Sequence, residues 1–559
     1  MKLTGSHIIL ECLLEQGVDT IFGYPGGSVL NIYDALYDYQ KSIRHILTAH
    51  EQGAVHAADG YARSTGKVGV ALVTSGPGAT NTVTGIATAY MDSIPLVVIT
   101  GNVPTFQLGL DSFQEVDITG VTMPVTKHNF IVKDIQKLAA TLRRAFEIAN
   151  SGRKGPVLVD IPKDITAAST EFTRQTHLPA SFYPAPNEDS IARAISMLET
   201  SQKPLLYIGG GVSSSIGANH ELERFVDLFD VPVAASLMGQ GGFDGRRDTY
   251  LGLLGMHGSK ASSMAIVGCD LLVAIGTRFS DRVILKIEQF APQAKILQID
   301  IDPAEVNKNI RVDHTVVGDA KDVLALLNQR LSPCKHTEWV NQTIEWKQKF
   351  PNIQTAKQSD GITPQEVLET LSVLTKSNAI VTTEVGQHQI WTAQYYQFCQ
   401  PRQFISSGGL GTMGFGLGAA IGAKLGNPEK TVINIAGDGS FHMNCQELVT
   451  LAKYQIPVIE CILNNGVLGM VRQWQNLFYG KRYSETTLQR EVDYIKLAEA
   501  YGILGLQMTS RDEIRPVLEQ ALTANRPVLL NIKIDPDLNV LPMVPAGGSI
   551  GEPILEIDD

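Results

Sequence analysis

Two polar residues that follow apolar runs have the types and positions of metal ligands. Asp438 lies in a Gly-Asp-Gly turn after the apolar run 432–436, and Asn465 follows a second run at 456–463. Both runs are typical of buried parallel strands. The carboxyl ends of such strands are where open α/β sheets bind their ligands. A carboxylate and a carboxamide oxygen suit Mg²⁺, which often leaves coordination positions for phosphates. The pattern therefore predicts a Mg²⁺ site for a phosphorylated ligand.

The Gly-Asp-Gly turn is not specific alone, because ordinary tight turns between a strand and a helix have the same composition. The second signal is the pair Asn464 and Asn465, which lies 27 positions beyond Asp438. The glycines let the backbone approach an anion, and the helix expected after Gly439 directs free N–H groups toward it. Together the turn and the asparagine pair match the signature of thiamine-diphosphate-dependent enzymes.

The chain resembles this enzyme class and, more narrowly, the catalytic subunits of acetohydroxyacid synthases (acetolactate synthases). The narrower resemblance rests on NNGVLGMVRQWQ at 464–475 and GGLGTMGFGLGAAIGAK at 408–424. It extends in the same order through GYPGGS, HEQGAVHAADGYAR, SGPGATN, FQEVDI, SGRKGPVLVDIPKD, LGMHG, GTRFSDR and IDIDPAE. The resemblance implies that pyruvate is decarboxylated and its two-carbon unit is joined to a second keto acid. With pyruvate the product is 2-acetolactate, and with 2-ketobutyrate it is 2-aceto-2-hydroxybutyrate, as in branched-chain amino-acid biosynthesis.

Alternating strand-like and helix-like patterns predict three doubly wound α/β domains with parallel sheets. We expect domains at 1–165, 189–332 and 363–559, joined by polar linkers at 166–188 and 333–362. By the resemblance, the first domain binds the thiamine pyrimidine. The central, Rossmann-like domain binds FAD, and the last domain binds the diphosphate and Mg²⁺.

The first and last domains contain similar segments. Residues 69–102 and 431–465 each read as a strand, a Gly-rich turn, a helix and a strand ending in Asn, which indicates two related domains. Pro77 stands in the early segment where Asp438 stands in the late one, so only the late domain can hold the metal. The early domain instead has Glu51. We therefore expect one active site built between the two domains and, as in the family, between subunits.

The resemblance assigns a catalytic role to Glu51 in the HEQGA motif. Its carboxyl would bond the aminopyrimidine ring and let the cofactor act as its own base. The alternative is a solvated acid stabilised by a helix N-terminus. The other implied cofactor contacts are a carbonyl of Gly411, the wedge Met413, diphosphate contacts at Gln387, His388, Gly439 and Ser440, and Mg²⁺ ligands at Asp438, Asn465 and the Val467 backbone oxygen.

The resemblance also implies a substrate pocket. Gly27 and Gln114 match positions near the reacting groups, and the pocket is shaped by Phe113, Val471 and Trp474, with Lys127 and Arg282 at its mouth. An indole beside the acceptor's alkyl group favours 2-ketobutyrate by rewarding its extra methylene. For the two cations, a solvated surface position is the alternative.

The central domain is expected to bind FAD as a structural group. A Gly-rich turn after a strand is a weak nucleotide signal alone, and an acid at a strand end can bind ribose hydroxyls. The positions that match the family's flavin contacts are Arg153, Gly210, Gly211, Leu254, Met256, His257, Gly276, Thr277, Arg278, Arg282, Asp300, Ile301 and Asp319.

Bulk properties agree with a multidomain globular enzyme. The chain has 559 residues, a net charge of −11 and six scattered cysteines, which argues against nucleic acid as a partner and against a disulfide framework. The N-terminus does not read as a signal peptide and no membrane span is expected, so we predict a cytoplasmic location. We further expect a homodimer or homotetramer and a regulatory small subunit.

Three other functions remain as alternatives. A flavin-dependent pyruvate oxidase would need no second keto acid, and Gln114 and Trp474 in their motifs argue against it. A glyoxylate carboligase would lack the glutamate that Glu51 supplies. A catalytically inactive scaffold is disfavoured because Glu51, Asp438 and Asn465 are all present.

Overall fold

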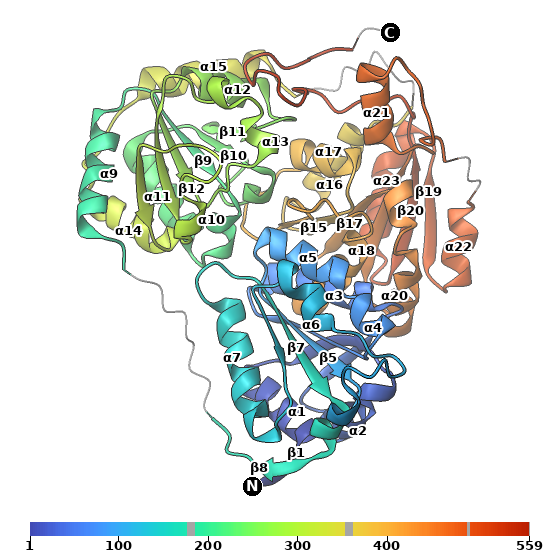
Figure 1. Ribbon diagram of the computed structural model, residues 1–559. Helices are drawn as coiled ribbons and strands as arrows, with labels where there is room; N and C mark the ends of the chain where they lie inside the picture. The colour runs from blue at the N-terminus through green and yellow to red at the C-terminus, as the bar shows by residue number, and fades with distance from the viewer. Residues whose placement is uncertain (176–184, 353–360, 489–491, 558–559) are drawn as a thin grey trace.

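The computed structural model describes residues 1–175, 185–352, 361–488 and 492–557. Within them the chain forms three α/β domains, each built on a six-stranded sheet whose paired strands all run parallel. Figure 1 shows the first domain in blue, the central domain in green and the last domain in orange to red. The predicted fold class is confirmed.

The N-terminal sheet has the strand order β3-β2-β4-β5-β7-β6. Its strands are β2 (Thr20–Tyr24), β3 (Arg44–Leu47), β4 (Gly69–Val73), β5 (Leu96–Asn102), β6 (His128–Ile131) and β7 (Pro156–Pro162). The helices are α1 (Gly5–Glu15), α2 (Leu30–Tyr39), α3 (Glu51–Thr65), α4 (Pro77–Thr80), α5 (Val83–Asp92), α6 (Ile118–Thr122), α7 (Leu138–Asn150) and α8 (Lys163–Ala167). A short antiparallel pair of β1 (Lys2–Thr4) and β8 (Ser169–Glu171) extends this domain beyond the expected boundary at 165.

The central sheet has the order β11-β10-β9-β12-β13-β14. Its strands are β9 (Pro204–Ile208), β10 (Val233–Ala235), β11 (Tyr250–Leu253), β12 (Leu271–Ile275), β13 (Lys295–Asp300) and β14 (His314–Val317). The helices are α9 (Glu188–Thr200), α10 (Gly210–Ser214), α11 (Ala218–Phe229), α12 (Lys260–Gly268), α13 (Asp281–Ile284), α14 (Ala320–Arg330) and α15 (Thr337–Lys349). Helix α15 lies within 333–362, a segment whose pattern predicts a helix as well as a linker, and its Trp339 is buried in the core of the central domain.

The C-terminal sheet has the order β16-β15-β17-β18-β20-β19. Its strands are β15 (Ile380–Thr383), β16 (Phe404–Ile405), β17 (Val432–Gly437), β18 (Val458–Asn464), β19 (Leu504–Met508) and β20 (Val528–Lys533). The helices are α16 (Pro364–Leu374), α17 (Gln387–Tyr395), α18 (Gly416–Gly426), α19 (Asp438–Phe441), α20 (Leu448–Tyr454), α21 (Gly469–Phe478), α22 (Tyr494–Ala500) and α23 (Ile514–Thr523). Thr363 and Glu366 form a capping box that starts α16, which satisfies free N–H groups of its first turn.

The first and last sheets have the same order of strands along the chain: second, first, third, fourth, sixth, fifth. This equality supports the interpretation that the two domains are related. The domains pack through α3 and α18, which lie side by side in the centre of Figure 1 and share one apolar core. Glycines at this contact let the helix backbones touch. A Cβ atom on Gly422 would lie 2.8 Å from the Tyr61 nitrogen, and one on Gly418 would lie 2.8 Å from the His56 Cβ.

The C-terminal tail leaves its own domain and returns to the central one. In Figure 1 it runs in dark red over the top of the molecule toward α12. The Val544 N–H donates to the Met256 carbonyl at 2.7 Å, and the Lys260 ammonium donates to the Gly551 carbonyl at 2.9 Å. Ile550 is buried in the central core. The tail therefore connects the C-terminal domain to the central domain near Met256 and Lys260.

None of the helices in the described ranges is long and apolar enough to cross a membrane. The six cysteines all lie in described segments and all are free thiols.

Candidate active site

The two predicted metal ligands meet at one edge of the C-terminal sheet. Gly437 of β17 pairs with Leu463 of β18, so Asp438 and Asn465 follow neighbouring strand ends. Asp438 is 4% exposed, and its Oδ1 has no hydrogen-bond partner among the residues that the structure describes. Burial raises the pKa of this carboxyl to about 6, because desolvation penalises the ionised form. A buried carboxylate oxygen without a partner is the expected state of a ligand that awaits a cation.

A small cavity of about 90 Å³ lies beside these strand ends. The predicted cofactor and metal residues that line it are Gln387, His388, Met413, Gly439, Ser440, Asn465 and Val467. Three buried atoms beside it lack a hydrogen-bond partner in the described ranges, namely Gln387 Oε1, His388 Nε2 and Trp391 Nε1. Burial lowers the pKa of His388 to about 3, so the ring is neutral. Unpaired donors and acceptors around a buried carboxylate fit a diphosphate with its Mg²⁺, since both supply the missing partners.

Glu384, which the sequence reading did not single out, links the two turns that border this cavity. It is fully buried at the end of β15. Its carboxylate accepts the Gly414 N–H at 2.7 Å, the Leu417 N–H at 3.2 Å and the Ser440 hydroxyl at 2.8 Å. Burial raises the pKa of Glu384 to about 7. Because its hydrogen-bond partners lie far away in the sequence, no local pattern predicts the role of Glu384, and it becomes visible only in the folded structure.

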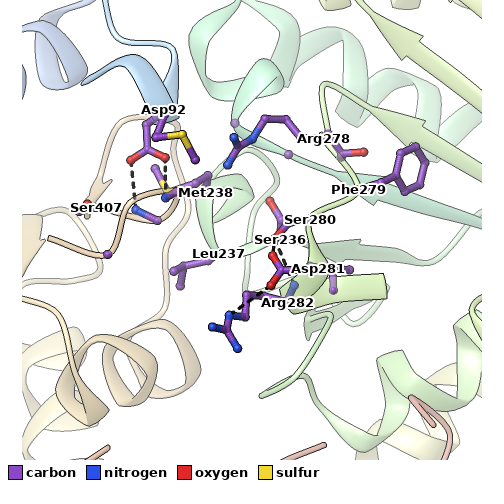
Figure 2. A pocket seen from close by; sticks show the side chains of 18 of the residues that line it. Asp92, Ser236, Leu237, Met238, Arg278, Phe279, Ser280, Asp281, Arg282 and Ser407 are labelled. Carbon is purple, nitrogen blue, oxygen red and sulfur yellow. Dashed lines mark hydrogen bonds and ion pairs between the residues drawn. The ribbon is translucent and has the colours of Figure 1, made fainter. Parts of the chain in front are cut away.

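A much larger cavity of about 1610 Å³ lies where the three domains meet and is lined by residues of all of them. Every residue expected to contact FAD lines it: Arg153, Gly210, Gly211, Leu254, Met256, His257, Gly276, Thr277, Arg278, Arg282, Asp300, Ile301 and Asp319. Figure 2 shows part of this cavity, with Arg278 and the Phe279–Arg282 segment on the central-domain side. The cavity thus collects positions from six separate segments of the sequence.

The chemistry of this cavity fits a dinucleotide. Gly211 and Gly276 approach so closely that a Cβ on either would lie 2.5 Å from the other's Cα, and such bare backbone admits a phosphate chain. Thr277 Oγ1 and Ser213 Oγ are buried without partners. Asp300 lies at the end of β13, where burial raises its pKa to about 6. Hydroxyl and carboxyl groups at strand ends suit ribose and phosphate oxygens.

Asp92 anchors the wall between this cavity and the turn that holds Gly411. Its carboxylate accepts the Gly409 N–H at 2.8 Å and the Gly408 N–H at 3.1 Å, the two dashed lines at the upper left of Figure 2. The buried Arg63 pairs with both Asp92 and Asp59. The sequence reading missed this group because its members act across the domain boundary.

The two cavities adjoin at the start of α21. Val385, Gly386, Met470 and Val471 line both of them. Gly411 and Trp474 line the large one. The residues expected to select the acceptor therefore stand where the cofactor pocket opens toward the large cavity.

The catalytic residues expected from the N-terminal domain form a separate cluster. The Glu51 carboxylate accepts the Asn81 side-chain N–H at 2.9 Å. Gln114 has a left-handed backbone, with φ of 59°, and packs against Gly76. Phe113 is 89% exposed, and a Cβ on Gly27 would meet nothing within 4 Å. None of Glu51, Gln114, Phe113 and Gly27 lines either cavity of the same chain.

Lys127 also lies outside both cavity linings. Its ammonium donates to the Ile148 carbonyl at 2.6 Å near the end of α7, and burial lowers its pKa to about 8. Within one chain, Lys127 therefore supports the end of α7, in contrast to Arg282, which does line the large cavity. The motif match did not foresee this local use of the side chain.

Three doubly wound domains, with a buried Asp438 and a partly buried Asn465 at the strand ends of the last one, define a thiamine-diphosphate-dependent enzyme. Family models agree domain by domain. They match the thiamine pyrophosphate enzyme N-terminal TPP-binding domain at 3–121, the central domain at 191–327 and the C-terminal TPP-binding domain at 384–532.

Whole-chain comparisons narrow this class. The chain is 47% identical to a probable acetolactate synthase large subunit of Methanocaldococcus jannaschii, covering 98% of this chain and 94% of the relative. It is 44% identical to the acetolactate synthase isozyme 3 large subunit of Escherichia coli, with 98% of each covered. It is 45% identical to the large subunit of Haemophilus influenzae, with 99% and 98% covered. The chain belongs to the acetolactate synthase large-subunit family.

Proposed function

We propose that this protein is an acetolactate synthase that decarboxylates pyruvate and joins the two-carbon unit to a second keto acid. The acceptor is pyruvate, giving 2-acetolactate, or 2-ketobutyrate, giving 2-aceto-2-hydroxybutyrate. The observation that supports this most directly is the small cavity beside the Asp438 and Asn465 strand ends, which shares Val471 with the large cavity that Trp474 lines. That arrangement leaves room for an acceptor next to the cofactor.

Thiamine diphosphate, when bound, supplies a carbon nucleophile that attacks the keto group of pyruvate. Asp438, Asn465 and the Val467 carbonyl would hold the Mg²⁺, and Gln387, His388, Gly439 and Ser440 would contact the diphosphate. Gly411 and Met413 would hold the pyrimidine end. Glu51 would hold a proton at the pyrimidine ring, with Asn81 orienting its carboxylate. Gly27, Gln114 and Phe113 would enclose the keto acid, and the Trp474 indole would contact the acceptor's alkyl group.

We further propose that the active site forms between two subunits, in a homodimer or homotetramer. In one chain the Glu51 cluster and the Asp438 pocket share no cavity. Apolar side chains expected in the substrate pocket are exposed in the single chain, for example Phe113 at 89% and Val471 at 51%. Exposed apolar surface of this kind often marks a contact with a second protein chain. A regulatory small subunit is proposed because the relatives are named large subunits.

FAD is proposed as a third cofactor, held in the large cavity without a redox step in the net reaction. The convergence of every expected contact on one cavity supports it. The visible spectrum of the purified protein tests this directly, because bound flavin absorbs in the blue and is released on denaturation.

The reaction is tested by incubating the purified protein with pyruvate under anaerobic conditions, then acidifying to convert acetolactate to acetoin for a colour assay. We expect colour only with both thiamine diphosphate and Mg²⁺ present. Adding 2-ketobutyrate should yield the second product, identified by mass spectrometry. Acetate formation that requires an electron acceptor would instead identify an oxidase. No turnover under any of these conditions would refute the proposal.

A further inference from the structure

Helix α21 supports the substrate pocket and is held by one buried side chain. Among the residues of α21, only Gln473 is buried, with 2% of its surface exposed. Val471 and Trp474, on either side of it in the sequence, line the large cavity. A helix with one buried residue has little apolar contact to fix its position. The contacts of Gln473, together with the Arg472–Asp537 ion pair to the same tail, therefore fix where these pocket residues lie.

The Gln473 amide pairs with the C-terminal tail through both of its polar ends. Its Oε1 accepts the Val540 N–H at 2.8 Å, and its Nε2 donates to the Val540 carbonyl at 2.9 Å. The tail backbone thus fixes which end of the amide carries the oxygen. Hydrogen bonds made by both ends of a buried amide hold its orientation, because a flipped amide would oppose donor to donor and acceptor to acceptor.

The fixed Gln473 amide in turn orients a side chain of the cofactor pocket. Gln387 Nε2 donates to Gln473 Oε1 at 3.0 Å and to the Leu538 carbonyl at 2.9 Å. The remaining atom, Gln387 Oε1, lies buried at the small cavity and has no partner within the described part of the chain. Gln387 consequently presents an acceptor to the cofactor pocket, and its contact with the diphosphate would run through a donor such as a bound water.

We propose that Gln473 is a positioning residue that joins the cofactor pocket, the C-terminal tail and helix α21, so that one amide sets both the Gln387 acceptor and the acceptor-selecting face of α21. This role rests on the proposed function, because the selectivity it sets is that between pyruvate and 2-ketobutyrate. On this proposal, the choice of acceptor depends on the buried residue Gln473 as well as on its neighbour Trp474 in the pocket.

Two variants separate this role from general support. Gln473→Glu keeps the shape but puts an oxygen against the Val540 carbonyl, and Gln473→Met removes every polar contact. The matched control is Gln394→Met on α17. Gln394 Nε2 also bonds the tail, at the Leu541 carbonyl (3.2 Å), and also bonds the His257 carbonyl (3.2 Å). This control variant removes a hydrogen bond to the tail next to Val540. It leaves the contacts of Gln473 with Val540 and with Gln387 in place.

The first readout is the ratio of 2-aceto-2-hydroxybutyrate to 2-acetolactate formed from mixed keto acids. We expect both Gln473 variants to lower it by about threefold to tenfold, a part of the discrimination that one methylene group permits. We expect the control to stay near the wild-type ratio. Unchanged ratios in both variants, or an equal fall in the control, would overturn the proposal. A wild-type protein that forms neither product would refute the proposed function instead.

The second readout needs no turnover. Hydrogen exchange of the purified protein is compared before and after addition of thiamine diphosphate and Mg²⁺. Because Gln387 connects the cofactor pocket to Gln473, binding should slow exchange in 469–478 and in 536–544 together. This joint protection should be lost in Gln473→Met and kept in Gln394→Met. Protection of α21 that persists in Gln473→Met would show that the helix is held by other contacts and would overturn the proposal.

Discussion

Replacing Gly422 by alanine tests how the two thiamine-binding domains are held together. Gly422 lies in α18 against α3, where a Cβ would sit 2.7 Å from the Ala57 carbonyl carbon and 2.8 Å from the Tyr61 nitrogen, and nearer still to the Ala57 oxygen. Carbon atoms pack at about 3.5–4.0 Å, so the helices must separate by on the order of 1 Å. The neighbours are backbone atoms of a buried helix and have no rotamer by which to yield.

The net effect combines two terms of opposite sign. Alanine improves helix propensity over glycine by about 1 kcal/mol, whereas overpacking a tight contact costs about 1–3 kcal/mol and more where backbone atoms collide. We expect a net destabilisation of about 2 kcal/mol and a fall in melting temperature of about 3–6 °C. Because α3 begins at Glu51 and α18 follows the Met413 turn, affinity for thiamine diphosphate should fall as well.

The assay is thermal unfolding by circular dichroism, with cofactor affinity measured by quenching of tryptophan fluorescence. The control is Gly268→Ala at the end of α12, where the nearest atom to a Cβ is the far edge of the Trp339 ring at 3.3 Å. A side chain can shift there, so we expect a melting temperature near that of the wild type. A Gly422→Ala protein that melts at or above the wild-type temperature would refute the reasoning about this interface.

Three other predictions concern the site. Glu51→Gln should lower turnover by roughly 10²–10⁴, the range for a proton-transfer group, without changing the melting temperature; near-normal turnover would contradict the role of the carboxyl. Trp474→Leu should lower the share of product formed from 2-ketobutyrate, and an unchanged product ratio would remove the indole from the acceptor pocket. Burial raises the pKa of Glu384 from 4.5 to about 7, so its stabilising contribution is complete below pH 4.5 and is lost as pH rises through 7. Glu384→Gln should therefore flatten that pH dependence, gaining up to about 3 kcal/mol relative to the wild type between pH 5 and 8, and parallel melting curves across that range would count against it.

Local sequence patterns were sufficient to predict the metal-binding part of the site. The apolar runs before Asp438 and Asn465 form neighbouring parallel strands, and the carboxyl ends of parallel strands meet at one edge of the sheet. The same reasoning yielded three α/β domains and the likeness of the first and last ones, which the identical strand orders support. The expected FAD contacts came from motif resemblance, and one cavity gathers them.

Other features depend on contacts between residues far apart in the chain. The N-terminal domain continues through β8 because that strand pairs with β1, a partner at the opposite end of the domain. The Lys127 ammonium donates a hydrogen bond to the Ile148 carbonyl near the end of α7, and no sequence motif predicts that contact.

The sequence by itself determined the chemistry available to this protein: a carboxylate and a carboxamide at strand ends, an acid in the early domain, and glycines where a backbone must approach an anion. The tertiary structure decided how these groups are aimed. Asp92 and Gln473 form hydrogen bonds across a domain boundary and to the C-terminal tail, and Glu384 accepts hydrogen bonds from distant segments of its own domain. Such hydrogen bonds form only after packing has brought distant atoms within about 3 Å of each other. A local sequence pattern therefore cannot predict them.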